Sequence, residues 1–262
     1  MPRFAANITL MFPEVPFLKR PAAARAAGFR AVECQSPYQV ERDALAEQLK
    51  ENAIELVLLN APNGGAESGE MGMAALPDKV LAFRETFALA LDYAAATGCP
   101  RIHCMAGCPG DDWPRDEIER VYQENLCHAA ERAAPHGITV MIEPINTRDC
   151  PGYALSTCAQ ARDLLTGVAA DNVALQFDFY HASIMEADPL AAFADHRDAI
   201  DHLQVSGRPG RHEPDGKQEI DFAKIFAEID RLGYHGWVGC EYNPRGDTLE
   251  GLAWARPYGI GP

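Results

Sequence analysis

Four polar residues stand at or near the ends of apolar runs in the second half of the chain. Each run is short and apolar enough for a buried β-strand, and each of the four residues carries a side-chain oxygen. The four are Glu143 at the end of ITVMIE, Asp178 at the end of VALQFD, Gln204 within HLQV and Glu241 at the end of WVGCE. A buried carboxylate costs several kcal/mol unless it is paired or bound to a metal ion. If these strand ends meet, their oxygens form a candidate cation site.

The donor set indicates which cation would suit this site. Carboxylate and amide oxygens are hard ligands, which Mg²⁺ and Mn²⁺ accept more readily than Zn²⁺ or Cu²⁺ does. In the alternative, the carboxylates pair with arginine or lysine inside the fold. That alternative is reasonable for any one of the residues and much weaker for all four together. We therefore predict a divalent metal site for Mg²⁺ or Mn²⁺, with the choice between the two ions left open.

Further polar residues are expected to face the same place. They are Asn7 and Glu33 on the first two candidate strands, Asn60 after the third, His103 on the fourth, and His181 three residues after Asp178. All of these except Glu33 are candidates for substrate binding. His202 lies two residues before Gln204, so both side chains share one face of their strand. For His103 and His202 a buried histidine with an internal partner is an equally good interpretation, and a packed loop histidine is the alternative for His181.

The segment Gly207–Gln218 stands out in an acidic chain because it gathers cationic side chains. These are Arg208, Arg211, His212 and Lys217. Such a cluster would supply the positive potential that an anionic substrate needs. An equally good alternative is a solvated loop whose charges are neutralised by Glu213, Asp215 and Glu219.

These residues require elements that bring strand ends together, and the chain alternates between short β-like runs and longer helical patterns. The candidate strands are Phe4–Thr9, Ala31–Cys34, Ile54–Leu59, Arg101–Cys104, Ile138–Ile142, Val173–Asp178, His202–Ser206 and Trp237–Glu241. The candidate helices are Phe17–Ala27, Arg42–Glu51, Lys79–Ala96, Arg115–Ala134, Cys158–Leu165, Pro189–Asp195, Phe222–Leu232 and, more weakly, Leu249–Arg256. Glycines that could end helices in a left-handed cap stand shortly before strands at Gly28, Gly98, Gly137 and Gly233.

Eight strand–helix repeats predict a parallel sheet that closes into a barrel. We expect a single (β/α)₈ TIM barrel over residues 1–262, since this fold typically needs about 250 residues. No G-x-G-x-x-G follows the first strand, so a dinucleotide-binding fold has no support. The longest irregular segments are Ala61–Pro77, Gly107–Pro114 and Ser206–Glu219. They follow strands and so belong to the C-terminal face of the barrel, where active sites lie.

Composition limits the classes of partner. The net charge of −15 argues against nucleic acid and anionic membranes, because an acidic surface repels phosphate groups. The mean hydropathy is −0.20, and no apolar run approaches the roughly 20 residues that span a bilayer. Pro13 and Glu14 interrupt the short N-terminal apolar stretch, so we expect no signal peptide and a cytoplasmic location. Self-association is common among barrels, but the sequence shows no decisive apolar patch for a homo-oligomer.

The eight cysteines are scattered along the chain. Cys104 and Cys108 come nearest to a metal-binding spacing, but no second pair accompanies them. Reduced thiols in a cytoplasmic protein are therefore the preferred interpretation.

With these residues in place, the chain resembles the hydroxypyruvate isomerase family within the xylose-isomerase-like barrel superfamily. The matching segments are FAANITLMF, GFRAVE, IEPIN with the following PGY, QFDFYH, HLQV, RHEP and YHGWVGCEY. They span nearly the whole chain in the right order, and IEPIN, RHEP and HGWVGCEY are the specific ones. The same branch includes the 2-oxotetronate isomerases, whose motifs overlap with these. The related ketose 3-epimerases usually carry histidine where this chain has Gln204, which favours the hydroxypyruvate branch.

The resemblance implies a divalent metal held by Glu143, Asp178, Gln204 and Glu241. It implies that Glu143 and Glu241 are the acid/base pair, and that His181 and the Arg211–His212 region face the substrate. The activity it implies interconverts hydroxypyruvate and tartronate semialdehyde by removing the proton next to a carbonyl, through an enediolate. Such a reaction needs a base within hydrogen-bond reach and positive charge at the developing oxyanion, which the metal would supply. The sequence leaves open which glutamate takes which step.

Three other functions stay open at this point. A ketose 3-epimerase would act on neutral sugars and would have no use for Arg208 and Arg211. An endonuclease acting at abasic DNA sites would need more histidine ligands and a basic surface. A barrel kept as a binding or scaffold module would not need carboxylates on four strands. The preferred expectation is an isomerase whose partner is a small-molecule 2-oxo acid, with no nucleic-acid or membrane partner.

Overall fold

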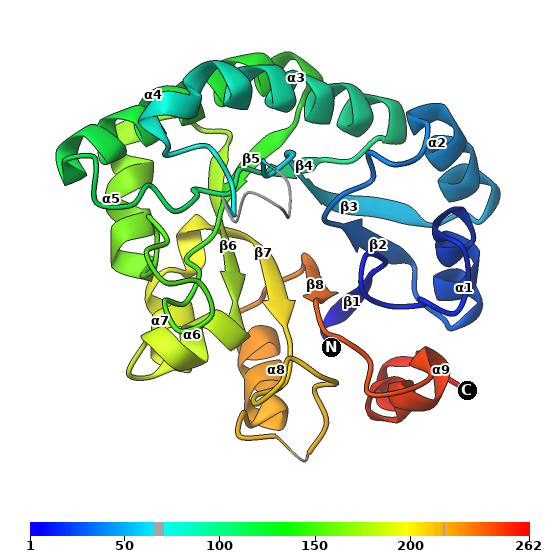
Figure 1. Ribbon diagram of the computed structural model, residues 1–262. Coiled ribbons are helices and arrows are strands. Elements are labelled where there is room, and N and C mark those ends of the chain that lie inside the picture. The colour runs from blue at the N-terminus through cyan, green and yellow to red at the C-terminus, as the bar shows by residue number, and fades with distance from the viewer. Residues whose placement is uncertain (65–70, 217) are drawn as a thin grey trace.

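The computed structural model of the protein describes residues 1–64, 71–216 and 218–262. Eight parallel strands close into a barrel in which each strand pairs with its neighbours in the sequence and β1 pairs with β8. Helices connect the strands and surround the barrel (Figure 1). The prediction of a (β/α)₈ TIM barrel is confirmed.

The strands and helices occur in the predicted order, apart from one additional helix. The strands are β1 (Arg3–Asn7), β2 (Ala31–Cys34), β3 (Glu55–Asn60), β4 (Arg101–His103), β5 (Thr139–Ile142), β6 (Val173–Asp178), β7 (Ile200–Val205) and β8 (Trp237–Cys240). The helices are α1 (Arg20–Ala26), α2 (Arg42–Glu51), α3 (Val80–Thr97), α4 (Arg115–Ala133), α5 (Cys158–Val168), α6 (Phe179–Met185), α7 (Pro189–Asp195), α8 (Phe222–Arg231) and α9 (Thr248–Gly251). Short 3₁₀ segments cover Phe17–Lys19, Pro77–Lys79, Ala134–His136, Arg197–Ala199 and Leu252–Tyr258.

The helix α6 has no counterpart among the predicted helices. It begins directly after β6, and Asp178 is its N-cap because the Asp178 Oδ1 accepts a hydrogen bond from the Tyr180 backbone N–H at 2.8 Å. His181 therefore lies in the first turn of a helix rather than in a loop. The predicted helix at Leu249–Arg256 is instead the short α9 followed by a 3₁₀ segment.

Two layers fill the barrel interior. Ala5, Ala31, Val57 and Trp237 form a small apolar cluster of their own. Side chains two residues apart on a strand share a face, so the next interior positions on β1, β2 and β8 are Asn7, Glu33 and Gly239. The interior is thus apolar at one level and polar at the next level toward the carboxyl ends of the strands.

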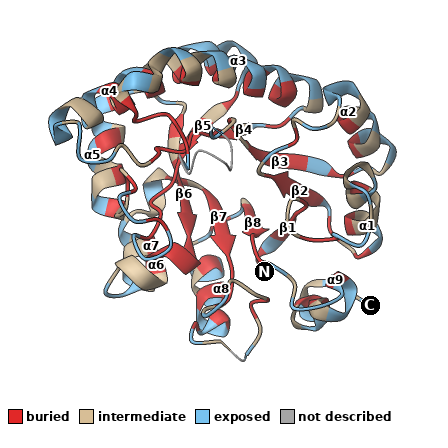
Figure 2. Ribbon diagram, in the orientation of Figure 1, coloured by how far each residue is buried: buried red, intermediate tan, exposed pale blue. Residues whose placement is uncertain are grey.

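The remaining core lies between the barrel and its helices. The strands are buried almost throughout, whereas the helices bury one face and expose the other (Figure 2). Phe177, Phe179 and Phe193 show how this layer packs, with ring centroids 5.0–5.8 Å apart between β6, α6 and α7. Among the described residues, no helix is long and apolar enough to cross a membrane.

Candidate active site

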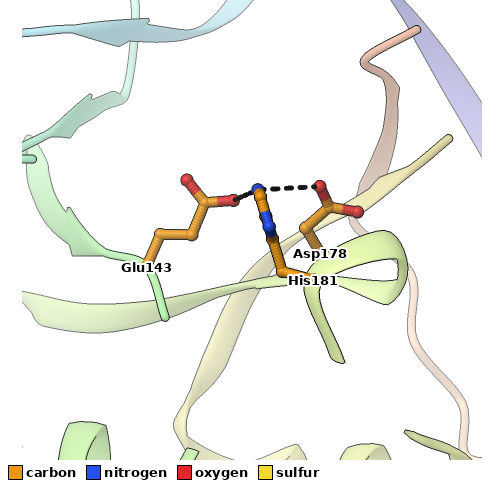
Figure 3. Close-up of side chains that lie close together, drawn as sticks. All are labelled: Glu143, Asp178 and His181. Atoms are coloured by element: carbon orange, nitrogen blue, oxygen red, sulfur yellow. Dashed lines mark ion pairs between the residues drawn. The ribbon is translucent and has the colours of Figure 1, made fainter. Parts of the chain in front are cut away.

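Two buried carboxylates and a histidine meet at the carboxyl ends of β5 and β6. Glu143 follows β5, Asp178 ends β6 and His181 lies on α6, with their side chains converging (Figure 3). The His181 Nε2 lies 3.7 Å from the Asp178 Oδ2 and 4.0 Å from the Glu143 Oε1. One ligand atom from each residue can be chosen so that all lie within 4.8 Å of one another. Within the described chain, the Glu143 Oε1 and the Asp178 Oδ2 have no hydrogen-bond partner.

The hydrogen bonds of His181 fix which of its nitrogens carries the proton. Its Nδ1 lies 3.3 Å from the Asn146 backbone N and 2.7 Å from the Asn146 Nδ2. A backbone N–H can only donate, so Nδ1 is the acceptor and the proton of the neutral ring sits on Nε2. This N–H is directed between the two carboxylates, so in this tautomer His181 can donate a hydrogen bond there, and the same three residues form a group that could hold a metal ion.

Glu241 is held from both sides. It directly follows β8, and its Oε1 accepts a hydrogen bond from the Gln35 Nε2 at 2.7 Å. Its Oε2 forms an ion pair with Arg211, whose Nη2 also lies 3.6 Å from the Asp178 Oδ2. The Arg211 guanidinium is 4.8 Å from the centre of the Tyr180 ring, within cation–π range. Arg211 is therefore the cation that partly balances the carboxylates.

The loop after β7 turns Arg211 inward through its backbone. Arg211 has a φ of 51°, a left-handed conformation that is uncommon outside glycine. Its carbonyl accepts a hydrogen bond from the Asn243 backbone N–H at 2.7 Å, and the Gly207 N–H donates to the His212 carbonyl at 2.8 Å. These bonds tie the loop to itself and to the segment after β8.

Gln204 belongs to a polar network beneath the carboxylates. Its Nε2 donates to the Glu33 Oε1 at 2.8 Å, and its Oε1 accepts from the Gln176 Nε2 at 2.6 Å. Asn7 also donates to the Glu33 Oε1, at 2.9 Å, and the His202 Nε2 lies 2.7 Å from the Glu33 Oε2. The interpretation of His202 as a buried histidine with an internal partner is thus confirmed.

Burial and like charges govern the ionisation of this site. Burial raises the pKa of the Glu143 carboxyl well above its usual range, and the charges of Glu241 and Asp178 raise it further. Burial also raises the pKa of Asp178 to about 7 and raises that of Glu241, although Arg211 opposes both shifts. Burial lowers the pKa of His181 well below its usual value, and Arg211 adds to this effect. The imidazole is therefore neutral, and the carboxylates resist ionisation unless a further cation joins them.

The residues present fit a hard divalent cation. Two buried carboxylate oxygens near the His181 Nε2 have no hydrogen-bond partner among the described residues, and the pKa values of all three carboxyl groups are raised because they are buried and crowded. A cation at this place would satisfy the orphaned oxygens and stabilise the ionised forms. The donor set is mainly oxygen, which suits Mg²⁺ or Mn²⁺.

Among the other predicted site residues, His103 lies beside the carboxylates, whereas Asn7 and Asn60 contact other residues. His103 lies close to the carboxylates, since its Nδ1 is 3.6 Å from the Glu143 Oε2, and burial lowers its pKa to about 3. Asn7 is engaged with Glu33, and its Oδ1 accepts from the Thr9 backbone N–H at 3.1 Å. Asn60 is partly buried, and its Nδ2 lies 3.8 Å from the Met105 Sδ. Their roles in substrate binding stay predictions.

The cationic cluster of the seventh loop does not act as a unit. The structure describes Arg208, Arg211 and His212 of this cluster, and of these three only Arg211 contacts the carboxylates of the site. Lys217 lies outside the described residues. Arg208 pairs with Glu219 at 2.8 Å and donates to the Ser183 carbonyl. His212 is partly exposed, with its Nδ1 2.8 Å from the Asn243 carbonyl oxygen.

Sequence reasoning missed Gln35, Gln176 and Asn146, which position site residues. A signal existed for Gln176, because it lies two residues before Asp178 and so shares its face of β6. Gln35 and Asn146 lie in loops, where no periodicity predicts the direction of a side chain.

Comparison with known proteins identifies the family. Residues 21–258 match the model of the family described as the xylose isomerase-like TIM barrel. The chain belongs to this family. It is 46% identical to a 2-oxo-tetronate isomerase of Cupriavidus necator, over 98% of this chain and 99% of that protein. It is 38% identical to the hydroxypyruvate isomerase of Escherichia coli, over 98% of this chain and all of that protein.

A solved structure agrees with this membership. The crystal structure described as an AP endonuclease, family 2, from Brucella melitensis superposes with a TM-score of 0.95 at 44% identity, covering 98% of this chain and 99% of that one. The resemblance to the hydroxypyruvate and 2-oxotetronate isomerase group is confirmed, and with it the expectation that this xylose isomerase-like barrel is an isomerase enzyme.

Proposed function

We propose that the protein interconverts hydroxypyruvate and tartronate semialdehyde by proton transfer through an enediolate, with Mg²⁺ or Mn²⁺ as cofactor. The observation that carries the proposal is the group of three buried carboxylates beside one guanidinium. Glu143 and Asp178 have oxygens without partners in the described chain, and Arg211 reaches both Asp178 and Glu241. This arrangement supports binding of a cation together with an anionic substrate.

Glu143 and Glu241 are the proposed proton carriers. Burial raises the pKa of both carboxyls in the cation-free site, and a bound cation would lower it again and favour the ionised form that accepts a proton. The bound cation, held by Glu143, Asp178, Gln204 and Glu241, would supply positive charge to the developing oxyanion. One glutamate removes the proton from the carbon next to the carbonyl, and it or its partner returns a proton to the neighbouring carbon.

Arg211 and His181 are proposed to orient the substrate. The side chain of Arg211 is 27% accessible, so it can pair with a carboxylate that enters the site. The Nε2–H of His181 is a donor without an ideal acceptor, at 3.7 Å from Asp178 and 4.0 Å from Glu143. It can therefore donate to a substrate oxygen held between them. His212, beside Arg211, would extend this binding surface.

The second candidate is 2-oxotetronate, a four-carbon 2-oxo acid. It is supported by the 46% identity to the 2-oxo-tetronate isomerase of Cupriavidus necator, close to the 44% identity to the putative hydroxypyruvate isomerases of Mus musculus and Homo sapiens. Both substrates need the same proton transfer and the same pairing with Arg211. A neutral ketose lacks the carboxylate that Arg211 would bind. DNA is disfavoured because the net charge is −15.

A substrate panel tests the proposal. Purified protein is incubated with Mg²⁺ or Mn²⁺ and either hydroxypyruvate, 2-oxotetronate or a ketohexose in D₂O, and proton exchange and products are followed by NMR. We expect turnover of a 2-oxo acid and none of the ketohexose. Turnover of the ketohexose alone would overturn the proposal, and a protein that binds neither ion would instead support a scaffold.

Variants of the two glutamates test the proton carriers. Glu143→Gln and Glu241→Gln remove the base but keep the shape of the side chain, so each should lower kcat by at least about 100-fold while the fold is retained, because general acid–base catalysis contributes roughly 10²–10⁴. Glu219→Gln is the matched control, since the Glu219 side chain is exposed and pairs with Arg208 instead of the carboxylate cluster. Near-wild-type rates in either active-site variant would refute the assignment.

A further inference from the structure

Glu33 is a buried carboxylate that the proposed reaction does not use. It lies on β2, its side chain is 1% accessible, and three donors surround it: the Asn7 Nδ2, the Gln204 Nε2 and the His202 Nε2 at 2.7–2.9 Å. Strand β8 makes room for it, because a Cβ at Gly239 would lie only 2.0 Å from the Glu33 Oε2. The barrel interior is thus built around this carboxylate.

The contact between Glu33 and Gln204 determines how the Gln204 amide is oriented. An amide is asymmetric, with two N–H donors on one atom and an acceptor oxygen on the other, whereas an ionised carboxylate only accepts. Because the Gln204 NH₂ faces the Glu33 Oε1, its oxygen must face the other way, where it accepts from the Gln176 Nε2. A carbonyl oxygen has two lone pairs, so one remains for a further partner.

We propose that Glu33 is a positioning residue that presents the oxygen of Gln204, and not its NH₂ group, to the divalent cation. The inference rests on the proposed function and deepens it, because it states why a neutral amide serves among the carboxylate ligands. Without an acceptor at position 33, the amide can turn over together with that of Gln176, whose Oε1 has no hydrogen-bond partner among the described residues. The Gln204 NH₂ group then faces the cation, and one ligand is lost. Outer partners of metal ligands act in this way in other metal sites.

Two other roles for Glu33 predict different results. If Glu33 only satisfies polar groups in the core, its removal lowers stability but leaves the cation affinity of the folded protein unchanged. If its negative charge attracts the cation directly, its removal weakens binding whatever residue stands at position 204. Only if Glu33 orients the Gln204 amide does the loss of cation affinity on removing Glu33 depend on having an asymmetric amide at position 204.

A double-mutant cycle separates the three roles. The dissociation constant for Mn²⁺ is measured on the metal-free, full-length protein for the wild type, Glu33→Met, Gln204→Glu and the double variant, with thermal melting as a check of the fold. Met has nearly the length of Glu but no acceptor. A carboxylate at position 204 offers an oxygen to the cation in either orientation. Glu55→Met, at an exposed position on the neighbouring strand, controls for the loss of charge.

We expect Glu33→Met to weaken Mn²⁺ binding by about 10-fold or more when Gln204 is present, the range found for outer-sphere partners of metal ligands. In the Gln204→Glu background the same substitution should not weaken binding. An equal loss in both backgrounds, or no loss in either, overturns the inference. Should Glu33→Met fail to fold, Glu33→Asp keeps the charge but withdraws the acceptor, and the same dependence on residue 204 is expected.

The double-mutant cycle also separates failure of this inference from failure of the proposed function. A wild type that binds no Mn²⁺ refutes the proposed metal site and the inference together. A wild type that binds Mn²⁺ and loses nothing on Glu33→Met leaves the proposed function standing and refutes the positioning role alone.

Discussion

Replacing Arg211 with glutamine should move the affinities for cation and substrate in opposite directions. The Arg211 Nη2 forms an ion pair with Glu241 and lies 3.6 Å from the Asp178 Oδ2, the oxygen that has no hydrogen-bond partner among the described residues. A divalent cation that binds this oxygen must lie close to the guanidinium and is repelled by it. An anionic substrate, in contrast, is attracted by the same group.

The size of both effects follows from charge and distance. Two unit charges 4 Å apart interact by about 4 kcal/mol at an effective dielectric constant of about 20, and the double charge of the cation doubles this figure. Because the Arg211 side chain is 27% accessible, solvent screens part of this repulsion. We expect a gain of about 1.4 kcal/mol, or roughly 10-fold tighter Mn²⁺ binding. A hydrogen bond to a charged group contributes about 1.5–3 kcal/mol, so KM for the 2-oxo acid should rise roughly 10- to 100-fold.

The assay pairs Mn²⁺ titration of the metal-free protein with steady-state kinetics on hydroxypyruvate. Arg208→Gln is the matched control, because Arg208 lies in the same loop but pairs with Glu219 and Ser183 instead of the carboxylate cluster. It should change neither constant by more than about twofold, as expected for a solvated ion pair. Weaker cation binding in Arg211→Gln would refute the reasoning, since Arg211 would then support the metal site rather than compete with it.

Three further predictions concern the cation, pH and the cysteines. Mn²⁺ at about 100 times its dissociation constant should stabilise the fold by about 2.7 kcal/mol, raising Tm by roughly 5–10 °C, and EDTA should abolish this gain in a melting experiment. The raised pKa of Asp178, about 7, favours the protonated folded form, so the stability that this carboxyl contributes to the metal-free protein is present at low pH and lost as pH rises from about 4 toward 7. Tm measured against pH should show this loss, and Asp178→Asn should make it smaller without abolishing it, because the pKa values of Glu143 and Glu241 are raised as well. Cys108 and Cys150 are free, with sulfurs 3.3 Å apart, so a mild thiol oxidant such as diamide should remove two titratable thiols, and Cys108→Ser should prevent it.

The strands were predictable because burial in a closed parallel sheet leaves a simple pattern. Short apolar runs end in a polar residue where the chain reaches the mouth of the barrel, as at Asp178 on β6 and Glu241 after β8. The helix α6 was missed because its N-cap, Asp178, had already been assigned as the end of a strand, so no separate start signal precedes the helix. One residue served both elements.

The site was predictable in its membership but not in its pairing. Residue types located Glu143, Asp178 and Glu241 together, since strand ends of a barrel meet at one face. The contact between Glu33 and Gln204 joins positions 171 residues apart, and it depends on barrel closure and register, which no local pattern encodes. The same holds for the inward turn of Arg211, which results from backbone hydrogen bonds to residues around it.

Charge balance indicates what selects the substrate in the proposed reaction. Glu143, Asp178 and Glu241 carry three negative charges when ionised, and a divalent cation with Arg211 matches them. A neutral glutamine or a neutral histidine at position 204 leaves this balance unchanged, and either can donate to Glu33 while offering one atom to the cation. Gln204 favours the hydroxypyruvate branch by resemblance, but on this charge balance it does not itself select a 2-oxo acid over a neutral ketose. We expect Arg211 to make that selection, because it is the group with which a substrate carboxylate can pair.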